Sequence, residues 1–140
     1  YSVYSYSSTY SDSGIFSVYI GTGAEKVAKF FAALHDELDR FIDEGVSQEE
    51  LSRTKKMIKS SMFMGLESVI SRMTRIARSI MMYDEYISPE EIVDRIYKVD
   101  AGMVQELARE LIVAENISLA AIGNKEVLPG VEAEFKRWYR

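Results

Sequence analysis

Residues 1–22 read YSVYSYSSTYSDSGIFSVYIGT, and this stretch contains the pattern that decides the fold class. In residues 1–10, Tyr4, Tyr6 and Tyr10 stand at even positions, and small polar residues fill most of the odd ones. This alternation with a period of two is typical of a β-strand. Residues 11–14 favour a turn, because Asp can bond its own backbone and Gly permits a positive φ. Residues 15–20 are more continuously apolar and predict a second strand, nearer the centre of a sheet. Together they predict an antiparallel hairpin.

Helical spacing dominates the chain after the hairpin. Apolar residues between 24 and 44 form one face of a predicted helix, and Gly45 stands where a left-handed C-terminal cap belongs. Ser47 and Glu50 have the spacing of a capping box, which predicts the start of the next helix. Around residues 67–69 the apolar residues no longer follow one helical spacing. We therefore expect a break in the helix there and a further helix that reaches Tyr83.

The second half of the chain predicts two shorter helices, one strand and a last helix. Residues 88–91 (SPEE) have the spacing of a second capping box, with Pro at the first helical position. Asp100 can cap the following helix. Residues 117–122 (ISLAAI) predict a buried strand, and residues 131–139 predict a terminal helix.

The resulting order, β-β-α-α-α-α-α-β-α, predicts an α+β fold. We expect a mainly antiparallel sheet with helices packed on one face. The length of 140 residues corresponds to one domain, residues 1–140. Three strands make a thin sheet for so many helices, and the chain begins inside a strand. We therefore expect an opening strand and helix of the same fold upstream of residue 1.

Composition argues against several functional classes. The net charge is −5 and no basic stripe is present, which argues against nucleic-acid binding. No apolar run approaches the ~20 residues of a membrane span, so we expect no membrane partner. The chain has no cysteine, which excludes disulfides and thiolate chemistry.

A single histidine, His35, limits the metal chemistry of the chain. A catalytic zinc ion usually takes three protein ligands from His, Glu, Asp and Cys, so we expect no metal site and no catalytic residue here. Asp36 and Asp39 lie close to His35, and residues 35 and 39 share a helical face as two ligands would. We favour a solvated helix face over a metal site, because acidic residues commonly border an apolar stripe.

Other candidate sites are incomplete. Gly21-x-Gly23 lacks the third Gly of a dinucleotide loop and the Gly-Lys-Ser/Thr of a P-loop, so we interpret it as a strand-to-helix turn. Arg72, Arg75 and Arg78 form a ridge that could hold a carboxylate of a peptide. We favour structural ion pairs for the ridge, with Glu67, Asp84 or a neighbouring helix as partners. No Ser lies in a Gly-x-Ser-x-Gly elbow, which argues against a serine hydrolase.

An ordered set of motifs extends over about residues 1–125 and resembles a known family. It consists of residues 1–22, Glu44–Arg53, Lys59–Ser61, Leu66–Ser68, Ser71–Met73, Tyr86–Glu91, Ile92, Arg95–Ile96, Val99–Ala101 and Asn116–Gly123. The set resembles the pitrilysin-type (insulinase-type) zinc metalloproteases, specifically their processing-peptidase branch.

The resemblance implies two similar α+β halves, joined by a linker, that enclose a chamber. The N-terminal half of such enzymes carries a His-x-x-Glu-His motif and a distant Glu ligand, and the Glu of the motif activates a zinc-bound water for amide hydrolysis. This chain contains no His-x-x-Glu-His and looks like the C-terminal half without its opening strand and helix. Its implied role is to close the chamber and hold an extended peptide, while zinc is bound by the other half.

One departure concerns the reacting carbonyl. In the larger members of the family the C-terminal half offers an Arg and a Tyr near the second strand of this hairpin. Here Arg40 is the first Arg of the chain, and Tyr19 cannot be assigned the role of that Tyr.

Two functions stay open at this point. The first is a segment of a zinc metalloendopeptidase that cleaves peptides or presequences, with the upstream half or another subunit as partner. The second is a non-catalytic scaffold subunit that pairs with an active partner. In both cases we expect the chain alone to be inactive and free of zinc, and an exposed sheet edge to drive oligomer or complex formation. Strong helix formers and plain loops favour the bacterial cytoplasm over the mitochondrial matrix.

Overall fold

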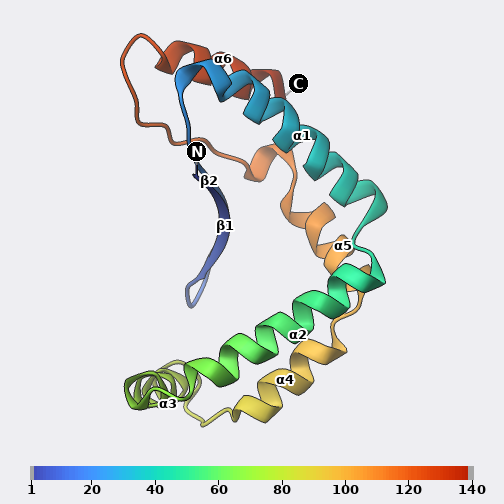
Figure 1. The fold of residues 1–140 in the computed structure, drawn as a ribbon, viewed down its shortest axis with the longest axis vertical. Helices are drawn as coiled ribbons and strands as arrows, with labels where there is room; N and C mark the ends of the chain where they lie inside the picture. Colours follow the sequence, from blue (N-terminus) through green and yellow to red (C-terminus); the bar gives the residue numbers. More distant parts are fainter. Residues whose placement is uncertain (1, 139–140) are drawn as a thin grey trace. The chain divides into compact units, whose positions relative to one another are not determined.

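A computed structural model describes residues 2–138, which contain one two-stranded antiparallel sheet and six α-helices (Figure 1). The α+β class is confirmed. The described residues fall into two compact units. The first comprises the residues up to Asp43 and those from Arg109 onward, and the second comprises Glu44–Ala108.

The first unit opens with the predicted hairpin. Strand β1 (Ser2–Thr9) pairs antiparallel with β2 (Gly14–Gly21), in a register that sets Tyr4 opposite Tyr19. The Tyr10 N–H donates to the Ser13 carbonyl at 2.9 Å and closes the turn. The period of two in residues 1–10 therefore identified β1, and the apolar run of residues 15–20 identified β2.

Two helices lie side by side in this unit (Figure 1). A 3-10 turn, Ala24–Lys26, leads into α1 (Val27–Glu44), and α6 (Leu128–Trp138) contacts it through aromatic rings. The ring centres of Phe31 and Phe135 are 6.4 Å apart. Helix α6 begins three residues before the predicted terminal helix, whose last predicted residue, Tyr139, lies outside the described residues.

The second unit contains α2 (Gln48–Gly65), α3 (Val69–Tyr83), α4 (Pro89–Lys98) and the start of α5 (Ala101–Leu111). Helices α2 and α4 lie side by side (Figure 1), and Lys55 of α2 donates to the carbonyl of Tyr97 at 3.1 Å.

Local capping chemistry fixes most of these boundaries. The capping box at Ser47 is complete, since the Glu50 N–H donates to Ser47 Oγ at 3.2 Å and the Ser47 N–H donates to Glu50 Oε2 at 3.0 Å. Gly45 has a φ of +70°, which confirms the predicted left-handed cap. Ser88 accepts from the Glu91 N–H, but the Glu91 carboxylate pairs with Arg95 instead, so only one half of the second box forms.

The predicted strand at residues 117–122 is wrong. Among the described residues the sheet has two strands rather than three, and residues 117–122 have no regular secondary structure. A strand needs a neighbour that takes up its row of N–H and C=O groups. Here β1 and β2 pair with each other, and Ile122 is fully exposed. Both faces of the hairpin are largely exposed as well.

Candidate functional site

One face of the hairpin consists mainly of tyrosine rings. Because side chains alternate along a strand, Tyr4, Tyr6 and Tyr19 share this face, which we call the tyrosine face. The ring centres of Tyr4 and Tyr19 are 4.9 Å apart and stacked, and those of Tyr4 and Tyr6 are 6.0 Å apart. Each ring is about half exposed. The three rings therefore form a continuous aromatic surface with hydroxyl groups at its border.

The Tyr19 ring lies close to Gly21. A Cβ at position 21 would lie 3.4 Å from the Tyr19 hydroxyl oxygen and 3.7 Å from the nearest ring carbon. The ring thus extends along β2 over a residue without a side chain. A Cβ at position 21 would therefore make ordinary van der Waals contact with the Tyr19 ring.

The opposite face of the hairpin is chemically different. It carries no tyrosine and combines four apolar residues with three that bear a hydroxyl group: Val3, Phe16, Val18 and Ile20, and Ser5, Ser7 and Thr9. Among residues 2–138, each strand bonds only to the other, so the outer edge of each has backbone N–H and C=O groups open to an extended chain. The hairpin therefore combines an aromatic, hydroxyl-bearing face with two strand edges that a peptide could join.

His35 lies in an ordinary helix-surface environment. Its Nδ1 is 3.0 Å from Asp39 Oδ2, one turn along α1, and both side chains are substantially exposed. The His35 ring also meets the Trp138 ring of α6 edge-on, with centres 6.0 Å apart. The structure thus brings His35 and Asp39 together, as their spacing predicted, and gives the imidazole a role in contact between α1 and α6.

The Gly21-x-Gly23 segment is the strand-to-helix turn that the sequence predicted. Strand β2 ends at Gly21, and helical structure begins at Ala24. A Cβ at Gly23 would meet the carboxylate of Glu25 at 2.5 Å. A carboxylate at this turn would repel a phosphate group, so the turn is unsuited to phosphate binding.

The arginine ridge of α3 divides into two kinds of residue. Arg75 Nη2 donates to the Ile87 carbonyl at 3.0 Å and so fixes the loop after α3. Arg72 and Arg78 make no ion pair with the residues that the structure describes, and the expected pairs with Glu67 and Asp84 are not formed. Their guanidinium groups are therefore open to another molecule.

Sequence reasoning missed the contacts that hold the loop after α3. Ser79 Oγ donates to the Glu85 carbonyl at 2.7 Å and accepts from the Ile87 N–H at 3.0 Å. Ser79 is buried, and so is the Ile87 side chain. We call Ser79, Arg75 and the loop residues 84–88 the α3 clasp. A polar Ser amid the apolar residues of a predicted helix was the only signal for it.

Comparisons with known proteins show similarity to one family of peptidases. A family model described as "Peptidase M16 inactive domain" matches residues 1–58. An uncharacterized zinc protease of Bacillus subtilis is 33% identical over 129 residues, which cover 92% of this chain and 31% of the relative. The mitochondrial-processing peptidase subunit beta of Rattus norvegicus is 30% identical over 129 residues, 92% of this chain and 26% of the relative. The chain is thus similar, over most of its length, to peptidases of the M16, or pitrilysin-type, family.

The chain matches only part of the length of its relatives. An uncharacterized zinc protease of Streptomyces coelicolor is 33% identical over 88% of this chain but only 27% of its own length. The chain therefore spans about three tenths of the curated M16 relatives that it matches. The matched family model is that of a domain described as inactive.

The zinc ion implied by the names of these M16 relatives does not fit the residues of this chain. Within residues 2–138, no three His, Cys, Asp or Glu side chains gather in a group that could hold a metal ion. The His35–Asp39 pair supplies two donors on an exposed helix face, one fewer than a catalytic zinc usually takes from protein. No helix of the described residues is both long and apolar enough to cross a membrane.

Proposed function

We propose that this chain forms a non-catalytic wall of the substrate chamber in a zinc metalloendopeptidase that cleaves peptides or presequences. The observation that carries the proposal is the tyrosine face beside an open strand edge. M16 relatives named as zinc proteases and as a processing peptidase support the reaction class. The zinc ion would be held by another part of the full-length protein or by a partner subunit.

The hairpin suits an extended peptide in two ways. The outer edge of β1 or β2 can add a strand through main-chain hydrogen bonds, which do not depend on the peptide's sequence. The rings of Tyr4, Tyr6 and Tyr19 can contact alternate side chains of that peptide, and their hydroxyl groups can bond polar ones. This combination provides affinity with low sequence selectivity, as a chamber that accepts varied peptides requires.

A kinetic experiment on the full-length protein tests this role. Tyr19→Ala should raise KM for a fluorogenic peptide about fivefold to tenfold and leave kcat nearly unchanged, because it removes binding shared by the ground state and the transition state. Tyr10→Ala is the matched control, since Tyr10 is an exposed tyrosine of the same hairpin outside the paired residues, and its KM should stay near the parent value. A Tyr19→Ala protein with unchanged KM would refute the peptide-binding wall.

A scaffold subunit of the same fold is the second candidate. A matching family model described as an inactive domain and a relative named as a subunit support it. Zinc content and peptide cleavage of the full-length protein separate the two candidates. Stoichiometric zinc with cleavage supports the endopeptidase, whereas a zinc-free protein that forms a complex and cleaves only with its partner supports the scaffold.

We also propose the bacterial cytoplasm as the compartment. The Bacillus and Streptomyces relatives support a bacterial setting, and the rat relative provides the mitochondrial alternative. Fractionation of the native host, with antibodies against the chain, distinguishes the two.

A further inference from the structure

Helix α3 exposes an apolar face. Val69, Met73, Ile76 and Ile80 follow one another at helical spacing and form one stripe, which we call the α3 stripe. Val69 is 78% exposed, and even Ile76, the most covered of the four, is 41% exposed. Exposed apolar stripes of this kind mark interaction sites.

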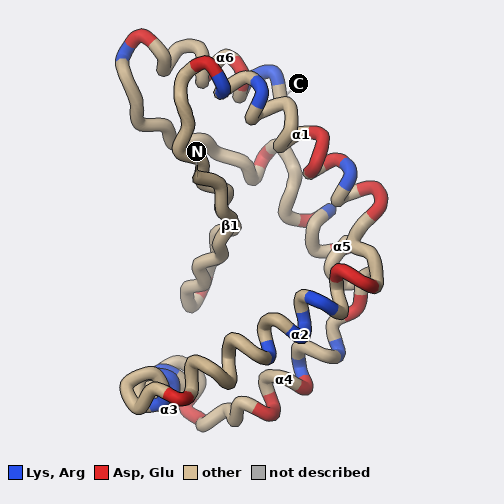
Figure 2. Tube along the Cα trace, in the orientation of Figure 1, with Lys and Arg blue, Asp and Glu red and all other residues tan. Residues whose placement is uncertain are grey.

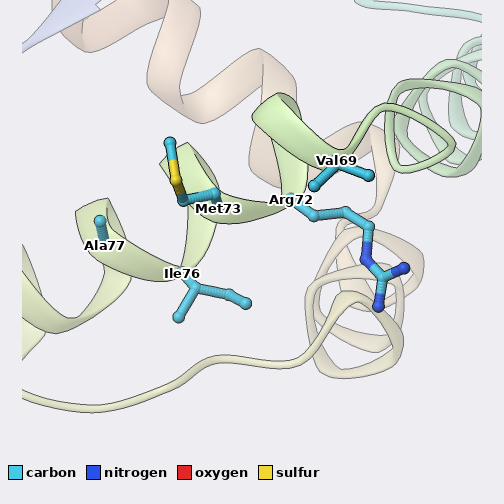
Figure 3. Close-up of a pocket in the computed structure, with 5 residues that line it drawn as sticks. All are labelled: Val69, Arg72, Met73, Ile76 and Ala77. Atoms are coloured by element: carbon cyan, nitrogen blue, oxygen red, sulfur yellow. The ribbon is translucent and has the colours of Figure 1, made fainter.

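A shallow hollow lies on the α3 stripe (Figure 3). It has a volume of about 440 Å³ and is lined by Val69, Arg72, Met73, Ile76 and Ala77. Four of the five lining side chains are apolar, and the fifth ends in the guanidinium group of Arg72. The flexible thioether of Met73 can adapt to the side chains of a partner.

Charge indicates which partner fits. Helix α3 contains three arginines and no Asp or Glu, in a chain whose net charge is −5 (Figure 2). Arg72 borders the α3 stripe and makes no ion pair with a described residue, whereas Arg75 is bonded to the α3 clasp. Among protein side chains, a carboxylate is the partner that can accept two parallel hydrogen bonds from a guanidinium group.

We infer that the α3 stripe docks an amphipathic protein helix whose apolar face is bordered by Asp or Glu. The apolar residues of that helix would cover Val69, Met73 and Ile76, and its carboxylate would pair with Arg72. Docking of an amphipathic helix on an apolar surface is an established recognition mode, with anchors at i, i+3, i+4 and i+7. The inference does not depend on the hairpin proposal, because the two use different residues.

An anionic lipid surface fits this region less well. Arg-rich amphipathic helices bind such membranes, but they carry aromatic or Leu residues on the apolar face. The apolar residues of the α3 stripe are Val, Met and Ile, and the net charge of the chain would repel anionic lipid. A protein helix is therefore the better partner.

Two labelled synthetic peptides test the inference on the whole chain by fluorescence anisotropy. They share one Leu-rich helical face, and one has Glu at the border positions while the other has Lys. The Glu peptide should bind at least about tenfold more tightly than the Lys peptide, with a preference that weakens as salt rises. Arg72→Glu should reverse the preference, and Met73→Asp should abolish binding of both.

Matched variants keep the test specific. Lys125→Glu makes the same charge change at an exposed loop residue of the other unit, and it should leave the peptide preference unchanged. Tyr19→Ala should also leave it unchanged, so failure here and failure of the hairpin proposal are distinguishable. Circular dichroism confirms that each variant keeps its helix content.

Three results would overturn the inference. The first is equal binding of the Glu and Lys peptides, or a preference that Arg72→Glu leaves intact. The second is a dimer in sedimentation that Met73→Asp dissociates while neither peptide binds, which would assign the stripe to a second copy. The third is binding to vesicles of phosphatidylcholine and phosphatidylglycerol that Arg72→Glu abolishes, again with neither peptide bound.

Discussion

Residues 84–88 and residues 117–122 both lack helix and strand, yet their surroundings differ. In the first stretch the backbone bonds to Ser79 and Arg75, and the Ile87 side chain is only 7% exposed. In the second stretch Ile122 has an exposed fraction of 105%, the value of a side chain with no cover at all. An apolar residue is thus fixed in one irregular segment and fully hydrated in the other.

The difference shows what an irregular segment needs in order to be fixed. The α3 clasp supplies hydrogen-bond partners for the loop backbone from residues close in sequence, and the Ile87 side chain within it is buried. Residues 117–122 have the apolar pattern of a strand but no strand beside them among the described residues. Strand β1, in contrast, has a pairing partner, because β2 follows it after a turn of four residues, 10–13. An apolar pattern gives structure only where a partner is within reach.

The largest expected effect comes from truncating the same residue type in the two segments. Ile87→Ala should lower the free energy of unfolding by about 3 kcal/mol, because it removes buried methyl groups and leaves a cavity. Ile122→Ala should change it by less than about 0.5 kcal/mol, since the side chain is already hydrated. Urea denaturation of the whole chain measures both. Similar losses for the two variants would mean that residues 117–122 are covered in solution.

Removal of the Ser79 hydroxyl is expected to have a smaller effect. Ser79→Ala should cost about 2 kcal/mol, because the hydroxyl bonds both the Glu85 carbonyl and the Ile87 N–H, and the latter group is buried. Ser60→Ala, an exposed Ser within α2, is the control and should be neutral or slightly stabilising. Denaturation curves of the two variants, recorded under the same conditions, provide the comparison. Equal stability of Ser79→Ala and the parent chain would show that the α3 clasp does not hold the loop.

Much of the fold was predictable because it depends on neighbours in sequence. The hairpin, the Ser47 capping box, the Gly45 cap and the break before Val69 all follow from residues a few positions apart. The strand at 117–122 was predicted wrongly, since its formation depends on a distant partner that no local pattern specifies. The half-formed box at Ser88 failed for a local reason: Arg95 competes for the Glu91 carboxylate, as a residue four positions on can.

The candidate site was less accessible to sequence reasoning than the fold. The alternation of tyrosines predicted a strand, but the stacking of Tyr4 on Tyr19 depends on the register of the hairpin. The three arginines of α3 look equivalent in sequence, and only the loop geometry distinguishes Arg75 from Arg72. The sequence does establish which reactive side-chain groups are present, namely one imidazole and no thiol.

The smallest expected effect concerns a contact that needs no distant partner, the Glu132–Lys136 pair of α6. A hydrogen bond from Lys136, and then its charge, hold the pKa of the Glu132 carboxyl below its ordinary value of 4.5. Any stability from this pair is therefore present above pH 4.5 and is lost as pH falls through the lower folded-state pKa. Lys136→Gln should raise the pKa of Glu132 toward its ordinary value, as an NMR titration of the Glu132 side-chain carbonyl would show.

Arg137→Gln, which removes the partner of Glu134, is the control and should leave the pKa of Glu132 unchanged. If Lys136→Gln also leaves the pKa of Glu132 unchanged, the Glu132–Lys136 ion pair does not persist in solution. Helix α6 would then lack this local contact, which residues 117–122 also lack.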